Sequence, residues 1–314
     1  MARGVETHFV VNPKASGGRA LRVWNTMAPR FHAAISGPRV HFTSGPKDAT
    51  HLTRAALREG AELVVSVGGD GTLNEVVNGF FLGQEPVKPG AALGLFMVGT
   101  GGDFRKTLDL PHPPAAQLER LLAGRERVLD LGRLTFTRLD GGTEERYFQN
   151  IASFGLSGAT DAAVNALTWG RALGGKVAYQ WGLLKALIGY KNQPVRIRVD
   201  DHFDEVITVN MAAVCNGQYF GGGMRVAPEA EPDDGLFDVV IVGDIGKGEL
   251  LRRVNKVYTG AHIGMERVFH LRGRRVVAEP VDAASPVLID LDGEMAGCLP
   301  AVFEVAPGAV RVRV

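Results

Sequence analysis

Two apolar runs in the first part of the chain end abruptly in glycines followed by an aspartate. The first reads V-V-S-V-G-G-D-G-T-L-N from Val64 to Asn74, and the second reads G-L-F-M-V-G-T-G-G-D-F from Gly94 to Phe104. Apolar, β-branched runs of this kind predict buried strands. If the two strands are neighbours in a parallel sheet, bare backbone N–H groups and two carboxylates meet at one edge. Such groups can hold nucleotide phosphates and a divalent metal, so phosphoryl transfer is the first hypothesis.

The composition limits the alternatives. A chain of 314 residues predicts two domains, and a net charge of +1 gives no support to a nucleic-acid partner. Cys215 and Cys298 lie far apart without a C-x-x-C motif, so we expect neither a disulfide framework nor a structural zinc site. No signal-peptide pattern opens the chain, and no run reaches the ~18 apolar residues of a transmembrane segment. We therefore expect a cytoplasmic protein whose contact with the inner membrane surface is at most peripheral.

The pattern of the chain changes near Leu129. Before it, strand and helix patterns alternate, which predicts an α/β domain with a helix-covered parallel sheet. We expect strands over 7–12, 39–43, 62–67 and 92–98, and helices over 19–31, 48–59, 72–81 and 115–123. After it, runs such as V-R-I-R-V and F-D-V-V-I-V predict a mostly antiparallel, β-sandwich-like domain, with helical stretches over 158–190 and 247–258. The predicted domains are 1–128 and 129–314, with the extreme C-terminus packing back on the first.

The turn from Gly68 to Asn74 is the strongest candidate site. Glycines let the backbone approach a phosphate without a Cβ clash, and a helix starting at Thr72 adds free N–H groups. A tight turn capped by Thr72 explains one or two glycines, but not three with an aspartate. The chain has no G-x-x-x-x-G-K-[ST] motif, and Asn74 stands where a dinucleotide fingerprint needs a small residue, so neither of these alternatives fits.

Three further loops of the first domain are open to two interpretations. Asn12 and Lys14 lie in a small-residue loop that can touch phosphate or adenine, or can be a plain connector. The turn that starts at Thr43 has the same status. Asp103 alone is as well explained as a helix N-cap, but together with Asp70 it predicts a pair of magnesium ligands.

The second domain has acidic turns. In the stretch from Asp290 to Glu294, the glutamate is a candidate general base, although spacing alone favours a hairpin turn with solvated acids. The stretch from Ala230 to Leu236 can hold a divalent ion through one side chain and carbonyls, or can be a surface turn. The sequence around Ser157 approaches a nucleophile elbow, but the parallel sheet precedes it, so we expect a helix cap there.

Taken together, these motifs resemble a known family. The stretches V-G-G-D-G-T-L-N-E-V-V-N-G, G-T-G-G-D-F, N-G-Q-Y-F-G-G-G-M-R-V-A-P-E-A-E-P-D-D-G-L-F-D-V-V and L-D-G-E occur in the order found in the diacylglycerol kinase catalytic-domain family. The similarity is strongest to its bacterial soluble lipid kinases, and the family also includes sphingosine and ceramide kinases. The resemblance covers nearly the whole chain. It implies an α/β nucleotide-binding domain beside a β-sandwich-like lipid-substrate domain, with a cleft between them.

The resemblance also implies roles for individual residues. ATP would contact Thr43, Gly68, Gly69, Asp70, Gly71, Thr72, Leu73, Asn74 and Thr100, and Asn12 is a further candidate contact. Glu294 would be the proton acceptor, while Asp70 and Asp103 would organise the catalytic Mg²⁺ with Asp130 in the same network. A structural Mg²⁺ would bind Asp234 and the carbonyls of Glu231 and Leu236. The family usually has asparagine where this chain has Gly102.

The sequence therefore predicts an ATP- and Mg²⁺-dependent kinase for a diacylglycerol-like lipid held at a membrane surface. The stretch from Tyr179 to Tyr190 is apolar with aromatic ends, and a buried core helix is favoured over a membrane-lying one. A homodimer is left open. The alternatives are an NAD kinase-like enzyme, which shares a G-G-D-G-T turn, and a lipid-binding protein without catalysis.

Overall fold

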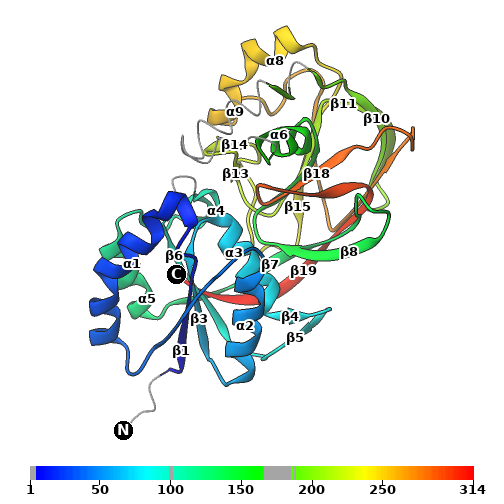
Figure 1. Cartoon of the computed structure of the whole chain (residues 1–314). Helices are drawn as coiled ribbons and strands as arrows, with labels where there is room; N and C mark the ends of the chain where they lie inside the picture. The colour runs from blue at the N-terminus through cyan, green and yellow to red at the C-terminus, as the bar shows by residue number, and fades with distance from the viewer. Residues whose placement is uncertain (1–4, 99–101, 166–184, 187–188) are drawn as a thin grey trace. The chain divides into compact units, whose positions relative to one another are not determined.

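The computed structural model describes residues 5–98, 102–165, 185–186 and 189–314 (Figure 1). The chain forms two compact units. Unit 1 comprises Met1–Leu129 together with Gly308–Val314, and unit 2 comprises Asp130–Pro307.

Unit 1 is built on a parallel sheet in the order β2–β1–β3–β6–β19. The strands are β1 (Thr7–Val11), β2 (Arg39–Phe42), β3 (Leu63–Gly68), β6 (Ala92–Met97) and the end of β19 (Glu294–Arg313). Every residue of β1, β3 and β6 is buried, as the continuous apolar runs predict for a sheet covered on both faces. In this register Val67 pairs with both Val11 and Phe96, so the three strands end side by side. The predicted α/β class is confirmed.

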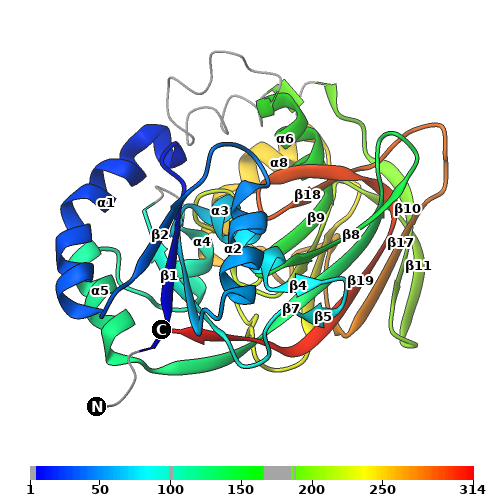
Figure 2. The same ribbon diagram turned by 60° about the horizontal axis from the view of Figure 1, so that its bottom comes forward.

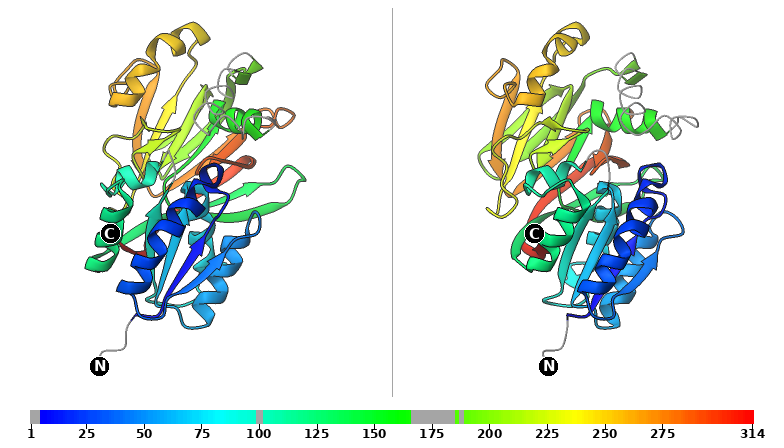
Figure 3. Two further views of the ribbon diagram at one scale, coloured as in Figure 1. Left: turned by 60° about the vertical axis from the view of Figure 1, so that its left-hand side comes forward. Right: turned by 90° about the vertical axis from the view of Figure 1, so that its left-hand side faces the viewer.

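Helices cover both faces of this sheet. Helices α1 (Ala15–Ala34) and α5 (Pro114–Ala123) lie on one face, and α2 (Asp48–Arg58) and α3 (Asp70–Gly79) lie on the other (Figures 2 and 3). The core under α1 is aromatic, with the Phe9 ring 5.1 Å from that of Trp24 and 4.8 Å from that of Phe31. The smaller elements are β4 (Phe81–Leu82), β5 (Glu85–Pro86) and α4 (Asp103–Thr107).

Unit 2 is antiparallel and rich in β-strands, which confirms the class predicted for the second half. One row of strands runs β16–β15–β12–β9–β18–β19, β17 joins β10 to β19, and β10 pairs with β11. The bounds are β7 (Glu126–Thr137), β8 (Thr143–Phe148), β9 (Ile151–Gly155), β10 (Gln193–Val199), β11 (Phe203–Val209), β12 (Met211–Cys215), β13 (Tyr219–Phe220), β14 (Met224–Arg225), β15 (Phe237–Val242), β16 (Val268–Gly273), β17 (Arg275–Pro280) and β18 (Leu288–Leu291). The core of unit 2 contains side chains from the row β16–β15–β12–β9–β18–β19 and from β10, among them Phe154, Ile197 and Phe237.

The helical stretch predicted over 247–258 is confirmed, and it consists of two helices, α8 (Lys247–Arg253) and α9 (Asn255–Thr259), which meet at Val254. Helix α6 (Leu156–Asn165) begins before the predicted residue 158. Most of the predicted stretch from Tyr179 to Tyr190 lies outside the described residues. Within the part of the chain that the structure describes, no helix is both long and apolar enough to cross a membrane.

Candidate functional site

The glycine turn of unit 1 joins β3 directly to α3. Helix α3 begins at Asp70 with Gly69 as its N-cap, two residues earlier than predicted, so Thr72 lies within the helix and is not its cap. A Cβ at Gly68 would lie 2.5 Å from the Thr72 hydroxyl oxygen, which explains why this position is glycine. The same hydroxyl accepts a hydrogen bond from the Asn12 amide at 3.0 Å, so the end of β1 is tied to the turn.

Gly69 is glycine for a different reason. Its φ of −102° and ψ of −171° are accessible to any residue, and an added Cβ would meet no atom within 4 Å. The fold of the turn therefore does not require glycine here. A bare backbone at an open position next to a helix N-terminus is what a phosphate group needs for close approach. The packing of the turn therefore explains Gly68 but does not explain Gly69.

Asp70 and Asp103 lie together at the ends of the neighbouring strands β3 and β6. The amide groups of Gly102, Asp103 and Phe104 donate hydrogen bonds to the Asp70 carboxylate, with a distance of 3.5 Å for Phe104. Burial raises the pKa of Asp70, the negative charge of Asp103 raises it further, and the three amides oppose both effects. The two carboxylates predicted to bind one metal are therefore close enough to repel each other.

Lys106 compensates part of this charge. The Lys106 ammonium contacts Asp103 at 2.7 Å, three residues further along the chain and one turn of helix away. The Asp103 residue is only 6% exposed. Carboxylate oxygens are the ligands that Mg²⁺ prefers, and the two aspartates fit a site for this ion. Gly102, the departure from the family pattern, has a φ of +55° and provides the N-cap of α4, so Asp103 is the first residue of that helix and not its cap.

The other predicted nucleotide contacts are placed as follows. The Thr43 amide donates to the Val11 carbonyl at 2.9 Å, which puts Thr43 beside the end of β1. Leu73 is fully buried, so only its backbone can contact a ligand. The Asn74 side-chain oxygen accepts a hydrogen bond from Asn78 at 3.2 Å. Gly71 lies in the first turn of α3, and Thr100 falls outside the described residues.

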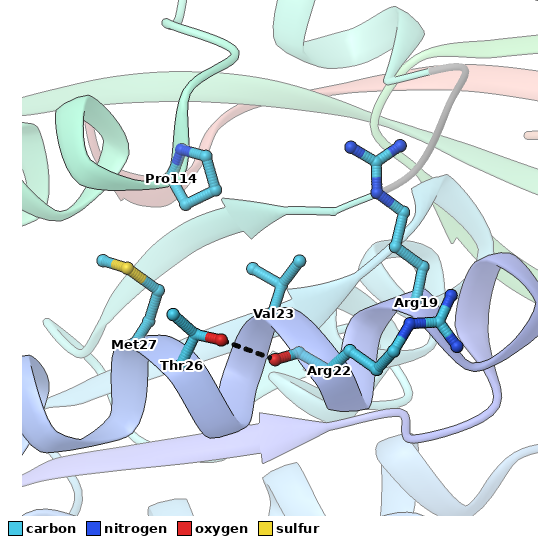
Figure 4. Close-up of a pocket in the computed structure, with 6 residues that line it drawn as sticks. All are labelled: Arg19, Arg22, Val23, Thr26, Met27 and Pro114. Carbon is cyan, nitrogen blue, oxygen red and sulfur yellow. Dashed lines mark hydrogen bonds between the residues drawn. The ribbon is translucent and has the colours of Figure 1, made fainter.

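The loop after β1 has an unusual backbone. Ser16, Gly17 and Gly18 all have positive φ, of 52°, 63° and 82°, before α1 continues in regular geometry. Further along α1, the side chains of Arg19 and Arg22 line a shallow pocket of about 360 Å³ (Figure 4). The remaining lining residues are Val23, Thr26, Met27 and Pro114. None of the predicted nucleotide contacts that the structure describes is among these lining residues.

In unit 2, the turn before Glu294 is held by two aspartates. The Asp292 carboxylate accepts the backbone amides of Gln149, Asn150 and Ile151 at 3.2, 3.2 and 2.9 Å. Asp290 is 4% exposed and accepts the Gly293 amide at 2.8 Å. The interpretation of this stretch as a turn with solvated acids is therefore wrong for both aspartates. Glu294 opens β19 and is exposed, so a fixed turn presents its carboxylate to the surface.

Asp130 binds the acidic turn of unit 2. Its carboxylate accepts the Gly235 amide at 2.7 Å, and its own amide donates to the Pro232 carbonyl at 2.7 Å. In the same turn, the Asp234 carboxylate accepts the Leu236 amide at 3.0 Å and pairs with Arg272. Glu231 is exposed. Among the described residues, no group of three or more His, Cys, Asp or Glu side chains is arranged to hold a metal.

A structural cation at this turn would share its one carboxylate ligand with an arginine. Asp234 offers one carboxylate, and a metal would have to compete with Arg272 for it. Carbonyl oxygens at the turn could supply the remaining ligands.

The structure also shows residues that the sequence reasoning missed. Lys106 could have been found from its spacing of three from Asp103, since this spacing brings side chains together on a helix. Asp161 on α6 could not, because it reaches its partner Asp290 only through the fold. Ser157 lies inside α6 and is not its cap, and its buried hydroxyl is hydrogen-bonded to the hydroxyl of Ser153 at 2.8 Å.

Comparison with known proteins places these features in context. Residues 6–134 match the profile described as the diacylglycerol kinase catalytic domain, and residues 150–314 match the YegS C-terminal NAD kinase beta sandwich-like domain. A diacylglycerol kinase of Mycobacterium tuberculosis is 27% identical over 306 residues, covering 96% of this chain and 93% of the relative. One from Bacillus subtilis is 29% identical over 277 residues, covering 87% and 84%.

A solved structure with the same fold comes from Bacillus anthracis. This diacylglycerol kinase superposes with a TM-score of 0.70 at 20% identity, covering 100% of this chain and 98% of its own. A second structure from the same organism gives a TM-score of 0.75 at 24% identity, with the same coverage. At this level of identity the superpositions show that the fold is shared.

Proposed function

Because the chain belongs to the diacylglycerol kinase catalytic-domain family, we propose that it transfers the γ-phosphate of ATP to the hydroxyl of a diacylglycerol-like lipid with the help of Mg²⁺. The observation that most supports this proposal is the approach of Asp70 and Asp103 at the ends of two adjacent parallel strands, next to the open Gly69 position. An acid pair beside a bare backbone turn offers both a metal ligand set and a phosphate cradle.

Unit 1 would bind the nucleotide. The backbone at Gly69 and the first turn of α3 would contact the phosphates, and Asn12, Thr43 and Thr72 would contribute polar groups around them. Asp70 and Asp103 would hold Mg²⁺, which when bound neutralises phosphate charge during transfer. Lys106 keeps the Asp103 carboxylate oriented, since its ammonium already contacts one oxygen.

Unit 2 would supply the proton acceptor. Glu294 follows a turn fixed by Asp292, and a general base must be held in place relative to the hydroxyl that it deprotonates. Glu294 would accept the proton of the lipid hydroxyl as its oxygen attacks the γ-phosphorus. Catalysis would then consist mainly of positioning and charge neutralisation, as is general for phosphoryl transfer.

An acceptor panel tests this function directly. Transfer of ³²P from [γ-³²P]ATP is measured with diacylglycerol, sphingosine, ceramide, phosphatidylglycerol and NAD as separate acceptors. We expect a labelled, Mg²⁺-dependent product with diacylglycerol or a related lipid. Labelled NADP would support the NAD kinase alternative, and the absence of any product with every acceptor would support the lipid-binding alternative.

A structural cation at the acidic turn of unit 2 is a separate part of the proposal. Asp234 and the carbonyls of Glu231 and Leu236 would hold it, and Asp130 supports the turn. The test is the melting temperature without nucleotide, measured with and without Mg²⁺. Mg²⁺ should stabilise the wild type and leave Asp234→Asn unaffected, while an equal response of the two proteins would remove the site from the proposal.

The lipid substrate implies that the protein meets a membrane surface. Sedimentation with liposomes tests this, and Trp181→Ala tests whether the segment around residue 181 takes part. Reduced sedimentation of the variant at unchanged melting temperature would support a membrane-lying segment. Unchanged sedimentation would favour the core-helix alternative.

A further inference from the structure

Two buried carboxyl groups of unit 2 are in direct contact. Asp161 on α6 and Asp290 on β18 form a side-chain hydrogen bond with each other. Their residues are only 6% and 4% exposed. The two aspartates are far apart in sequence, and the fold of α6 against β18 brings them together. Neither has a role in the proposed transfer.

The hydrogen bond between them requires a proton. An ionised carboxylate only accepts hydrogen bonds, so two carboxyl groups can bond to each other only when one of them is protonated. Burial raises the pKa of both groups, and their mutual repulsion raises that of Asp290 further. Burial and the charge of each neighbour therefore favour the state in which the pair keeps one proton.

The surroundings of the pair fix its geometry. The Ser153 hydroxyl donates to one oxygen of Asp290 at 2.9 Å, and the Gly293 amide donates to the other at 2.8 Å. Helix α6 lies directly against β18, because an added Cβ at Gly158 would overlap the backbone of Leu288. Loss of the shared proton would place two negative charges across this tight contact.

The pair lies beside Glu294. The negative charge of Glu294 is one of the influences that raise the pKa of Asp161. The Gly293 amide, which bonds Asp290, belongs to the residue immediately before Glu294. Asp290 therefore stabilises the turn by accepting a hydrogen bond within it, from the Gly293 amide. Asp292 stabilises it by accepting amides at the start of β9. Among the described residues, the ionisable groups that act on the pair are Asp161, Asp290 and Glu294 themselves, with Ser153 and Gly293 as neutral donors.

We propose that Asp161 and Asp290 share one proton and act as a positioning pair that holds the turn carrying Glu294 against α6. This inference rests on the proposed function, since it assigns the pair to the proton acceptor of that reaction. With the proton in place, α6 and the turn are joined and only one charge of the pair faces Glu294. Without it, repulsion between the two aspartates loosens the turn and Glu294 loses its fixed position.

The sign of the pH dependence follows from linkage. The folded state binds the proton more tightly than the unfolded state, in which aspartate titrates near ~3.9. The contribution of the pair to stability is therefore complete at low pH. It is lost as pH rises through the raised pKa values of the folded pair.

The decisive variant is Asp161→Asn, whose amide replaces the shared proton by a permanent donor to Asp290. We measure kcat and KM for the lipid from about pH 6 to about pH 10 in wild type, Asp161→Asn and the surface control Asp201→Asn. The wild type and the control should lose kcat on the alkaline side, and Asp161→Asn should keep at least about threefold more of its neutral-pH kcat there. Because the pair is assigned no role in binding the substrate, the KM for the lipid should stay the same.

Two further measurements do not depend on turnover. The melting temperature should fall more steeply with rising pH in the wild type than in Asp161→Asn. Infrared difference spectra between wild type and Asp290→Asn at about pH 8 should show the C=O band of a protonated carboxylic acid only in the wild type. Asp161→Leu removes the carboxyl group altogether. If the melting temperature of this variant depends on pH as in the wild type, or if the C=O band is absent, the two aspartates do not share a proton.

The outcomes separate this inference from the proposed function. If Glu294→Gln is inactive and Asp161→Asn has the same alkaline profile as the wild type, the positioning pair is wrong and the kinase mechanism stands. If Glu294→Gln retains full turnover, Glu294 is not the proton acceptor. The infrared band and the pH slope of the melting temperature then still report whether the two aspartates share a proton.

Discussion

The Asp292 carboxylate accepts the amide hydrogen of Ile151 at 2.9 Å, which anchors the turn before Glu294 to the first residue of β9. The Asp292 amide returns a bond to the Ile151 carbonyl at 3.0 Å. A reciprocal pair of bonds between residues so distant in sequence makes this turn part of the sheet framework. The glutamate that follows is therefore presented from a rigid position, as a general base requires.

Replacement of Asp292 tests this anchor. Asp292 has a φ of +50°, a conformation that asparagine tolerates and alanine does not. Asp292→Ala should lose about 1–3 kcal/mol of unfolding free energy, because it leaves buried amides without an acceptor. Asp292→Asn keeps an acceptor oxygen and should lose less. Urea unfolding measures both, and equal losses in the two variants would show that the anchor is not a hydrogen-bond effect.

The two adjacent glycines of the first unit give a matched pair of variants. Gly69→Ala should leave the melting temperature close to that of the wild type, since its Cβ meets no atom within 4 Å. It should weaken ATP binding by about tenfold, or ~1.4 kcal/mol, by blocking close approach of a phosphate. Gly68→Ala should instead destabilise the fold by about 1–3 kcal/mol, because its Cβ collides with Thr72.

Calorimetric titration of ATP and thermal unfolding read out these two effects separately. A Gly69→Ala protein with unchanged ATP affinity would remove the glycine turn from the nucleotide site. A Gly68→Ala protein as stable as the wild type would contradict the close packing of the turn on Thr72.

The metal ligands of unit 1 are tested by their dependence on Mg²⁺. Asp70→Asn and Asp103→Asn each remove one negative charge from the pair and should raise the Mg²⁺ concentration needed for half-maximal rate. We expect a fall in kcat of at least about a hundredfold, since charge neutralisation carries much of phosphoryl transfer. Glu75→Gln serves as a control in the same unit, because Glu75 caps α2 through the Lys47 and Ala49 amides. Wild-type Mg²⁺ dependence in both aspartate variants would exclude them as ligands.

The fold of unit 1 could be predicted closely because its strands β1, β3 and β6 are buried along their whole length. A parallel strand covered on both faces has a continuous apolar sequence, and this is the pattern of β3 and β6. Helix boundaries were less predictable. Aspartate is a favoured N-cap residue, but Lys47 and not Asp48 is the N-cap of α2, and the amides of Lys47 and Ala49 donate to Glu75 of α3. A helix capped by a residue from another helix leaves no local pattern.

In the candidate site, too, some residues could be paired from the sequence and others could not. Asp70 and Asp103 could be paired from sequence because both follow strands, and strand ends meet at one edge of a parallel sheet. The Asp161–Asp290 pair could not, since the two residues come from a helix and a distant strand and nothing in the sequence singles out Asp161. A D-G turn is usually solvated, so the sequence predicts that the Asp292 carboxylate faces solvent. In the structure this carboxylate accepts three backbone amides.

The most direct test of the account is the rate of ³²P transfer from [γ-³²P]ATP to diacylglycerol in wild type and Glu294→Gln, at saturating Mg²⁺. Glutamine keeps the size of the side chain and cannot accept the proton, so the melting temperature and ATP affinity should match those of the wild type. We predict that kcat falls by about a hundredfold to ten-thousandfold, the usual contribution of a general base. A folded Glu294→Gln protein that phosphorylates diacylglycerol at the wild-type rate would contradict the account.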